Sequence, residues 1–377
     1  MYQIKGKIDS TNAAEFEKEI MAAQPKEIDA SQLKYISSAG LRVLLKLAKT
    51  VGDVTVNNVS SEVYEIFDVT GFTEILNVRK AFREIDINGK EKIGQGGNGT
   101  VYRLDDERIV KVYRKEHNLE FIEREQQYAK SAFVSGIPSV ITFDIVKVGE
   151  CYGVVFEAMN SDTLSHAIVT EPEKKDEYIM KYVQLAKTLH TTEIKGDTII
   201  TLKELLYSRL DDEFMKEVLS AEEIAVLHSI VDAMKDTNTL VHGDFHPGNI
   251  MLQNGELMLI DMGEVTRGVP IYDVASVFRD LISAPKNNPD ITRMSMGLEP
   301  ELAMEIGTKF IAMYTGITNP QALEGYMKQL GLVYAFNVVM LLTEMPLREM
   351  RAPLVVENLL RPVVIPNAAA LKHILSK

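Results

Sequence analysis

At the start of the chain, stretches of alternating apolar and polar residues are interleaved with segments of helical periodicity. Residues 2–8 alternate as a half-buried strand does, and residues 27–33 return to a strand pattern. Between these stretches, Ser10 is placed to cap a helix that buries Phe16 and Ile20. Because strands that alternate with helices build layered sheets, we expect a small α/β unit here.

The small residues at 37–40 form a tight loop that opens the next predicted helix. We expect the apolar stripe of this helix to consist of Leu41, Leu44, Leu45 and Ala48. A further strand follows at residues 54–56, and another helix begins at Ser60 or Ser61. The alternation of elements thus extends to about residue 85.

The pattern changes twice in the rest of the chain. Strand patterns predominate from residue 93, and helical periodicity takes over beyond about residue 160, except around residues 240–261. The longest apolar run, 330–342, is shorter than the roughly 20 residues that cross a bilayer, so we expect a buried helix. The predicted organisation is an α/β domain at 1–86, a strand-rich lobe at 90–160 and a helical lobe at 161–377.

Composition and charge narrow the class of protein. The single Cys151 excludes a disulfide framework and fits a reducing compartment, and the N-terminal residues lack an apolar core of signal-peptide length. We therefore expect a soluble cytoplasmic protein without a membrane partner. The formal net charge is −13, of which residues 1–85 contribute about −1 (11 Lys+Arg against 12 Asp+Glu). Such an acidic chain is not expected to bind nucleic acid, which needs basic patches.

A glycine-rich loop lies at residues 93–102, between two apolar stretches. Its glycines are Gly94, Gly96, Gly97 and Gly99. Glycines let backbone N–H groups approach phosphate oxygens closely. The residues that follow, 101–104, continue as a strand and not as a helix, which favours the hairpin lid of a kinase over a dinucleotide-binding fold.

A lone lysine, Lys111, lies in the apolar strand 109–113. Such a lysine neutralises the α- and β-phosphates of a nucleotide, and it needs a carboxylate to fix its position. The helix predicted at 120–130 offers Glu123 and Glu125, of which we prefer Glu125. Taken alone, Lys111 could equally be an edge-strand lysine, but the glycine loop favours nucleotide binding.

The apolar strand at residues 152–159 ends at a polar junction. From its position in the chain, we expect it to link the two lobes. Glu157 to Met159 would then offer backbone groups to the adenine ring.

The stretch from Leu240 to Met251 carries the predicted chemistry. Asp244 is placed to orient or deprotonate an attacking hydroxyl. Asn249 follows five residues later, and Asp261 lies in an Ile-Asp-Met-Gly sequence. An amide oxygen and a second carboxylate are the ligands that hold Mg²⁺ against nucleotide phosphates, so we assign Asn249 and Asp261 as the metal ligands.

Two histidines flank Asp244. We expect His242 to brace the loop by hydrogen bonding. The alternation of His242, Asp244 and His246 also leaves a metalloenzyme open, but a single loop without further His or Cys residues makes a poor zinc site.

Residues 90–280, and His242 to Asn249 above all, resemble the aminoglycoside phosphotransferase and choline kinase-type families of the protein-kinase-like superfamily. The resemblance implies a bilobal α+β fold, with ATP and Mg²⁺ between a β-rich N-lobe and a helical C-lobe. It implies that Asp244 is the catalytic base, that Asn249 and Asp261 are the metal ligands, and that Lys111 binds phosphate. It adds Asp273 as a residue that stabilises the catalytic loop. About a dozen residues separate Asp261 from Asp273, too few for a peptide-holding segment, which favours a small-molecule hydroxyl acceptor.

Residues 5–10 and 29–42, with the Gly71-Phe72 turn, resemble the STAS domain family of anti-sigma factor antagonists. The serine that a partner kinase phosphorylates in this family falls on Ser38, and the aspartate that precedes it is replaced by Ser37. A phosphate on Ser38 would meet free backbone N–H groups at a helix N-terminus. The alternative is that both serines only cap the helix.

Two functions follow from these domains. The first is an ATP- and Mg²⁺-dependent phosphotransferase that acts on a small-molecule hydroxyl and is regulated or docked through the STAS domain, with a possible protein partner there. The second is a signalling switch in which the kinase-like domain controls or phosphorylates the STAS domain. The helical region beyond about residue 285, where these families keep their acceptor site, carries no motif, so the sequence leaves the acceptor open.

Overall fold

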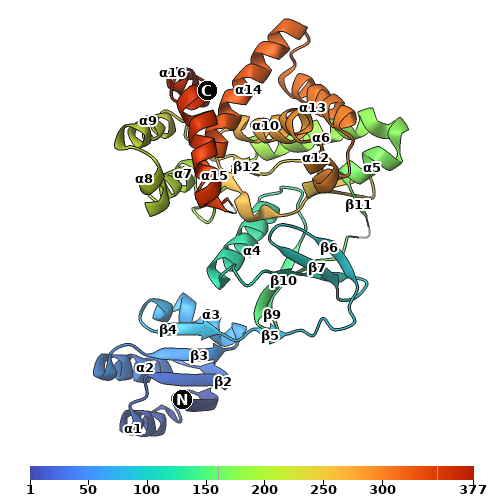
Figure 1. The fold of residues 1–377 in the computed structure, drawn as a ribbon. Helices are drawn as coiled ribbons and strands as arrows, with labels where there is room; N and C mark the ends of the chain where they lie inside the picture. Colours follow the sequence, from blue (N-terminus) through green and yellow to red (C-terminus); the bar gives the residue numbers. More distant parts are fainter. Residues whose placement is uncertain (160, 346) are drawn as a thin grey trace. The chain divides into compact units, whose positions relative to one another are not determined.

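The computed structural model describes residues 1–159, 161–345 and 347–377. The chain forms two compact units (Figure 1): residues 1–89 with 145–153, and residues 90–144 with 154–377. Asn160, where we expected the strand-rich lobe to end, lies outside the described residues.

The first unit contains a four-stranded sheet of order β1-β2-β3-β4, in which neighbouring strands run parallel. Its elements are β1 (Tyr2–Ile8), α1 (Ala13–Ala23), β2 (Glu27–Ile36), α2 (Ser38–Val51), β3 (Thr55–Val59), α3 (Ser61–Val69), η1 (Phe72–Glu74) and β4 (Asn77–Lys80). A helix crosses between each pair of strands, as parallel neighbours require. The core is fully buried at Ile28, Leu44 and Phe67, among others.

The first helix begins later than the sequence predicted. Thr11 donates both its N–H and its hydroxyl to Asp9 Oδ1, which holds residues 9–12 in a turn, and α1 begins at Ala13 after Asn12 instead of at a Ser10 cap. The buried face of α2 also differs from the predicted stripe, because Val43 and Leu47 are buried where Leu45 and Ala48 are only half-buried.

The strand-rich lobe contains a six-stranded sheet of order β5-β9-β10-β8-β7-β6. Its elements are β5 (Arg83–Glu84), β6 (Lys92–Gln95), β7 (Gly99–Arg103), β8 (Arg108–Tyr113), α4 (Leu119–Val134), β9 (Thr142–Val148) and β10 (Cys151–Glu157). The strands β6, β7 and β8 are antiparallel neighbours, as a kinase lid requires. Strand β5 and the turn end of the β9–β10 hairpin belong to the first unit, where Arg83 pairs with Val146.

The remaining residues form the helical lobe (Figure 1). Its elements are β11 (Asp162–Thr163), α5 (Leu164–Thr170), η2 (Pro172–Lys174), α6 (Lys175–Thr191), α7 (Leu202–Leu210), α8 (Glu213–Val218), α9 (Ala221–Asp232), β12 (Leu240–Val241), η3 (Pro247–Asn249), β13 (Ile250–Gln253), β14 (Glu256–Leu259), η4 (Met262–Glu264), β15 (Thr266–Arg267), α10 (Ile271–Phe278), η5 (Arg279–Ser283), α11 (Ala284–Asn287), α12 (Pro289–Met296), α13 (Pro300–Thr315), α14 (Pro320–Met340), α15 (Arg348–Val355), η6 (Val356–Val364) and α16 (Ala368–Leu375). The run predicted as a buried helix lies mostly in α14, where Leu330, Val333 and Phe336 are fully buried.

Aromatic packing fixes the centre of this lobe. Tyr182 on α6 stacks on Phe245 with ring centroids 4.9 Å apart, and Phe310 on α13 packs on Tyr182 at 4.4 Å. The Tyr182 hydroxyl donates to the Phe245 carbonyl at 2.9 Å. The residue after Asp244 is therefore anchored in the core, and the loop that contains it cannot shift without disturbing this packing.

Within the described residues, no single helix is long and apolar enough to cross a membrane. One bent pair, Arg348–Val364 with Ala368–Leu375, passes the same test of length and composition across a bend of 78°.

Candidate active site

The loop that contains Asp244 is held by the buried side chain of Asp273 on α10. The fully buried Asp273 carboxylate accepts the N–H of His242 at 2.7 Å and the N–H of Gly243 at 2.8 Å. Its Oδ2 also lies 3.0 Å from His190 Nε2, and His190 Nδ1 lies 2.7 Å from the Tyr314 hydroxyl. A carboxylate with this many partners holds two consecutive backbone groups in place.

Gly243 is required where the loop turns. Its φ is +82°, in the left-handed region, and a Cβ there would lie 2.7 Å from the carbonyl oxygen of Glu264. Any other residue would be strained and would push the segment that contains Glu264 away from the loop.

Three side chains converge on the Asp244 carboxylate. The Arg279 guanidinium donates to Oδ1 at 2.5 Å, and the Asn249 amide donates to Oδ2 at 3.0 Å and to the Asp244 carbonyl at 3.0 Å. His246 Nε2 lies 3.5 Å from Oδ2. Burial alone would raise the pKa of Asp244, but the hydrogen bond and charge of His246, followed by the charge of Arg279, lower it. The carboxylate is therefore ionised at neutral pH, as a proton acceptor must be.

The hairpin β13–β14 brings Asn249 and Asp261 together. Ile250 pairs with Leu259, and the Ile260 N–H donates to the Asn249 carbonyl at 3.0 Å, so both residues lie at the open end of the hairpin. Asp261 has φ 59° and ψ 68°, a left-handed conformation that is rare for residues other than glycine. Because the Asn249 side chain donates through Nδ2, its Oδ1 stays available, and with the Asp261 carboxylate it fits the few oxygen ligands that Mg²⁺ takes from a protein.

Lys111 on β8 is held by two carboxylates. Its Nζ donates to Glu125 Oε1 at 2.8 Å and to Asp261 Oδ1 at 2.9 Å. Of the two carboxylates offered by α4, Glu125 is the one in contact with Lys111. A Cβ at Gly263 would lie 3.3 Å from Glu125 Oε2, so the segment after Asp261 packs closely against α4.

The glycine loop forms the turn between β6 and β7. The Gly96 N–H donates to the Gly99 carbonyl at 2.9 Å, and a Cβ at Gly99 would lie 2.2 Å from the carbonyl oxygen of Val112. Gly99 is thus needed for strand packing. Around Gly94, Gly96 and Gly97 the backbone is open, with no contact shorter than 3.7 Å for an added Cβ.

At the end of β10, some backbone donors are already used. The Glu157 N–H donates to the Ile141 carbonyl at 3.0 Å, and the Ala158 N–H donates to the Glu107 carbonyl at 2.7 Å. The Glu157 carboxylate accepts the Ile141 N–H at 2.6 Å. The N–H groups of Glu157 and Ala158 are thus engaged within the protein, and among the described residues no such bond is found for the N–H of Met159.

The two histidines of the loop have separate roles. Fully buried His242 lies with Nε2 3.0 Å from the Ile260 carbonyl, which ties the catalytic loop to the β14 end that precedes Asp261. His246 Nδ1 accepts the Gly248 N–H at 3.1 Å. No group of three His, Cys, Asp or Glu residues in the described part of the chain could hold a metal ion, so the zinc alternative has no support.

Sequence reasoning missed Arg279, Asp280, His190 and Arg209. Arg279 donates to Asp280 at 2.8 and 2.7 Å as well as to Asp244. Arg209 is 4% exposed and contacts Glu264 at 3.2 Å and Glu344 at 2.7 Å. These residues lie on helices without a motif. The available signal was the Arg279-Asp280 pair directly after the mostly apolar residues 271–278. Charged residues in such a buried segment must have partners.

In the first unit, Ser38 is the first residue of α2 and is exposed. Ser37 is the N-cap, and its hydroxyl accepts the Ala39 N–H at 3.2 Å. The two adjacent serines therefore differ in structure, because one caps the helix and the other presents a hydroxyl to solvent.

A family model described as the phosphotransferase enzyme family matches residues 91–301, more than half of the chain. The chain belongs to this family. Membership confirms the prediction of an ATP-dependent phosphotransferase, and with it the bilobal kinase-like fold of the second unit.

A second family model, the STAS domain, matches residues 1–85 of this phosphotransferase. The putative anti-sigma factor antagonist BtrV of Bordetella bronchiseptica is 36% identical over 84 residues, which cover 20% of this chain and 72% of that protein. The predicted STAS domain is thereby confirmed.

Solved structures similar to the phosphotransferase include the aminoglycoside phosphotransferase APH(2″)-IIa in its streptomycin–ATP ternary complex. It is 14% identical, with a TM-score of 0.48, covering 81% of this chain and 98% of that one. A choline/ethanolamine kinase family protein from Mesorhizobium loti is 15% identical, with a TM-score of 0.44, covering 75% and 92%. Likeness at this level gives no information on the acceptor.

Proposed function

We propose that this phosphotransferase moves the γ-phosphoryl group of ATP to a hydroxyl of a small molecule, in the cytoplasm. The observation that carries the proposal is the Asp244 carboxylate, which accepts hydrogen bonds from Arg279 and Asn249 at the open end of the β13–β14 hairpin. The free thiol of Cys151 supports a reducing compartment. We propose the ranges 1–86, 90–160 and 161–377 as the STAS domain and the two lobes.

Each polar residue has a task in this reaction. Asp244 orients the acceptor hydroxyl and receives its proton as the oxygen attacks. Lys111, fixed by Glu125, binds nucleotide phosphate oxygens, and the open backbone of the glycine loop covers them. Asn249 and Asp261 would hold Mg²⁺, which supplies neutralisation of the phosphate charge. Catalysis then rests on positioning and electrostatic stabilisation.

The surroundings of Arg209 support a small polar acceptor. A small pocket beside Gly243 is lined by Arg209, Glu264 and Arg279, among others. The carboxylates of Glu264 and Glu344 share the single Arg209 guanidinium and are 43% and 45% exposed. Charged groups that are partly open to solvent suit a small polar acceptor.

Replacement of the proposed base tests the assignment. We expect Asp244→Asn to bind ATP about as tightly as the wild type and to lose at least about a thousandfold in turnover, as measured by ADP release across a panel of hydroxylated and aminated acceptors. Exposed Asp290→Asn on α12 is the control and should keep full turnover. Wild-type turnover by Asp244→Asn would refute the proposal.

The exposed Ser38 hydroxyl at the start of α2 favours a second candidate, a switch in which the kinase-like unit phosphorylates the STAS domain in the same or a neighbouring chain. Incubation with Mg-ATP followed by intact mass spectrometry tests it. A mass increase of one phosphate that is absent in Ser38→Ala supports the switch. An unchanged protein mass, with phosphate found on an added acceptor, excludes it.

A further inference from the structure

Tyr113 lies beside the Lys111–Glu125 pair and has no role in the motif of the active site. It follows Lys111 by two residues on β8, so the two side chains lie on the same face of the sheet. Tyr113 is 1% exposed, and Lys111 Nζ lies 5.0 Å from the centroid of its ring.

Among the described residues, two buried polar atoms at this place lack a hydrogen bond of ordinary geometry. Glu125 Oε1 accepts Lys111, but Glu125 Oε2 has no hydrogen bond among the described residues, and neither has the Tyr113 hydroxyl. A carboxylate oxygen only accepts and a phenol hydroxyl donates, so the two atoms are complementary. Both residues flank the same ammonium group, because Lys111 Nζ lies 2.8 Å from Glu125 Oε1 and 5.0 Å from the centroid of the Tyr113 ring. Buried groups of this kind are almost always paired in a working protein.

The Tyr113 ring is held in place from its other sides. His117 and Phe121 pack edge-on against it, with ring centroids 6.2 and 6.3 Å away. In the β7–β8 pairing Tyr113 lies opposite Gly99, the last glycine of the loop. Tyr113 thus connects the strand that carries the glycine loop with the carboxylate that fixes Lys111.

We propose that Tyr113 is a positioning residue of the nucleotide site, whose hydroxyl donates to Glu125 Oε2 and fixes the carboxylate that holds Lys111 for the nucleotide phosphates. The inference rests on the proposed function. Lys111 is shared between Glu125 and Asp261 in this structure. When Asp261 takes part in nucleotide binding, Glu125 alone holds Lys111. The position of Lys111 then depends on how firmly the Glu125 carboxylate is held.

Tyr113→Phe keeps the ring and removes only the hydroxyl. We expect its Kd for ATP, measured by calorimetry, to rise about three- to tenfold, which is less than the loss of a direct hydrogen bond to a charged group because Tyr113 acts through Glu125. KM for ATP should rise by the same factor, while kcat and the KM for the acceptor stay within about twofold. The matched control is Tyr178→Phe, which removes another tyrosine–glutamate hydrogen bond (to Glu171, 3.0 Å) on α6 and should leave ATP binding unchanged.

A double-mutant cycle separates positioning from packing. If Tyr113 acts through Glu125, then adding Tyr113→Phe to Glu125→Gln should weaken ATP binding by much less than it does in the wild type. Equal effects in both backgrounds, or no effect in the wild type, would overturn the inference. Thermal unfolding gives an independent test. If the buried Tyr113 hydroxyl makes no hydrogen bond, its removal in Tyr113→Phe should raise the melting temperature, and such a rise would contradict the proposal. A wild-type protein that binds no ATP would instead refute the proposed function.

Discussion

One guanidinium determines how the proposed base is held. Arg279 lies between Asp244 and Asp280, is 24% exposed in its side chain, and bonds both carboxylates. With His246, which contributes more, it lowers the pKa of Asp244, and its pairing with Oδ1 leaves Oδ2 to the Asn249 amide and to His246. The proposed proton acceptor is therefore held in one orientation by its neighbours before any ligand binds.

Arg279→Gln should leave two half-buried carboxylates facing one another without a cation. We expect kcat to fall about 10- to 100-fold, because Asp244 loses its orientation, while KM for ATP changes little. Arg279→Lys should recover part of the loss, since it restores the charge but not the forked geometry. Steady-state kinetics measures both.

Arg293→Gln is the control, because Arg293 pairs with Asp290 and Glu299 on the exposed surface of α12. Its kcat should match the wild type. An Arg279→Gln enzyme with wild-type kcat would show that Asp244 is oriented without the guanidinium.

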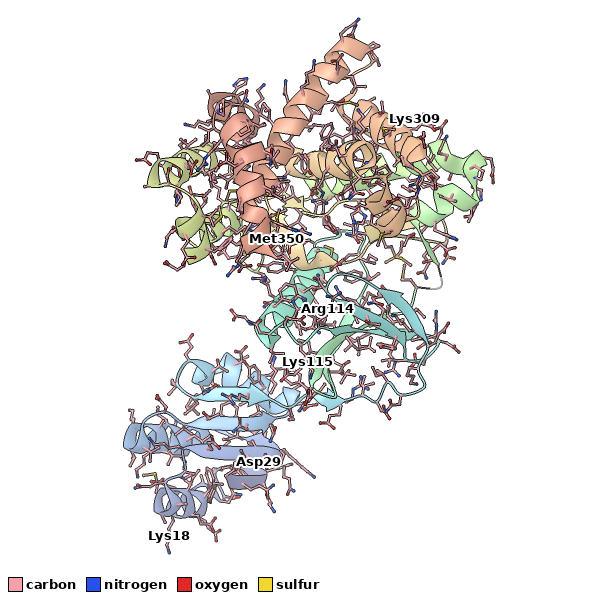
Figure 2. The ribbon with its side chains drawn as sticks, in the orientation of Figure 1. Lys18, Asp29, Arg114, Lys115, Lys309 and Met350 are labelled. Atoms are coloured by element: carbon pink, nitrogen blue, oxygen red, sulfur yellow. The ribbon has the colours of Figure 1, made fainter. Side chains whose placement is uncertain are left out.

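In the first unit, Asp29 on β2 joins three strands (Figure 2 labels it). Its carboxylate accepts from Gln3 on β1, from Ser31, and from Asn58 on β3 at 3.0–3.1 Å. The hydrogen bond from Asn58, followed by those from Ser31, lowers the pKa of Asp29. A lowered pKa in the folded state stabilises the fold above the unfolded pKa, and the gain is lost as pH falls through the folded pKa.

Asp29→Asn should therefore be modestly less stable than the wild type at pH 7, and this difference should shrink below about pH 4. Urea unfolding of the full chain at several pH values measures the effect. The exposed Asp53→Asn, in the turn before β3, should show no such pH dependence. A constant difference between Asp29→Asn and the wild type from pH 7 to pH 3 would contradict the assignment.

At the scale of elements, the glycine loop combines two kinds of glycine. Gly99→Ala places a Cβ 2.2 Å from the Val112 carbonyl, whereas Gly97→Ala meets no atom within 4 Å. We expect Gly99→Ala to be destabilised by about 1–3 kcal/mol, since β7 must move away from β8. Gly97→Ala should unfold at nearly the wild-type temperature. Thermal unfolding compares the two, and equal melting temperatures would exclude a packing role for Gly99.

The elements also show what sequence reasoning could reach. Glycines, Lys111, Asp244, Asn249 and Asp261 lie in short segments with fixed spacing, which is why the sequence alone singles them out. The structure brings Lys111 to Asp261 and Asn249 to Asp244. Arg279 and Arg209 reach the same region from helices. Tertiary packing alone decides which side chain of these helices points toward the site, so no local sequence pattern marks them. The start of α1 was wrong for a local reason, because the Asp9 turn competes with helix capping at Ser10.

At the scale of the whole molecule, the boundary between the units is not a simple linker. Strand β5 lies before the glycine loop in sequence, yet it pairs with β9, and Phe82 packs on Tyr152 with ring centroids 5.2 Å apart. The first unit therefore includes residues 145–153 as well as residues 1–89.

A chain shortened to 81–377 should accordingly be more stable than one shortened to 90–377, because only the longer one keeps β5 and Phe82 against the β9–β10 hairpin. Both keep every residue of the proposed active site, so we expect ATP to bind to both. Thermal unfolding and calorimetry measure the two effects. Equal melting temperatures would show that β5 contributes nothing outside the STAS domain.

The pairing of β5 with β9 also sets an order of assembly during synthesis. The four parallel strands of the first sheet are encoded without interruption between Tyr2 and Lys80, so this sheet can close as soon as it leaves the ribosome. Arg83 and Glu84 stay unpaired until Val146 and Lys147, their partners in β9, have been synthesised. We therefore expect the STAS sheet to fold first and β5 to pair only after β9 has been synthesised.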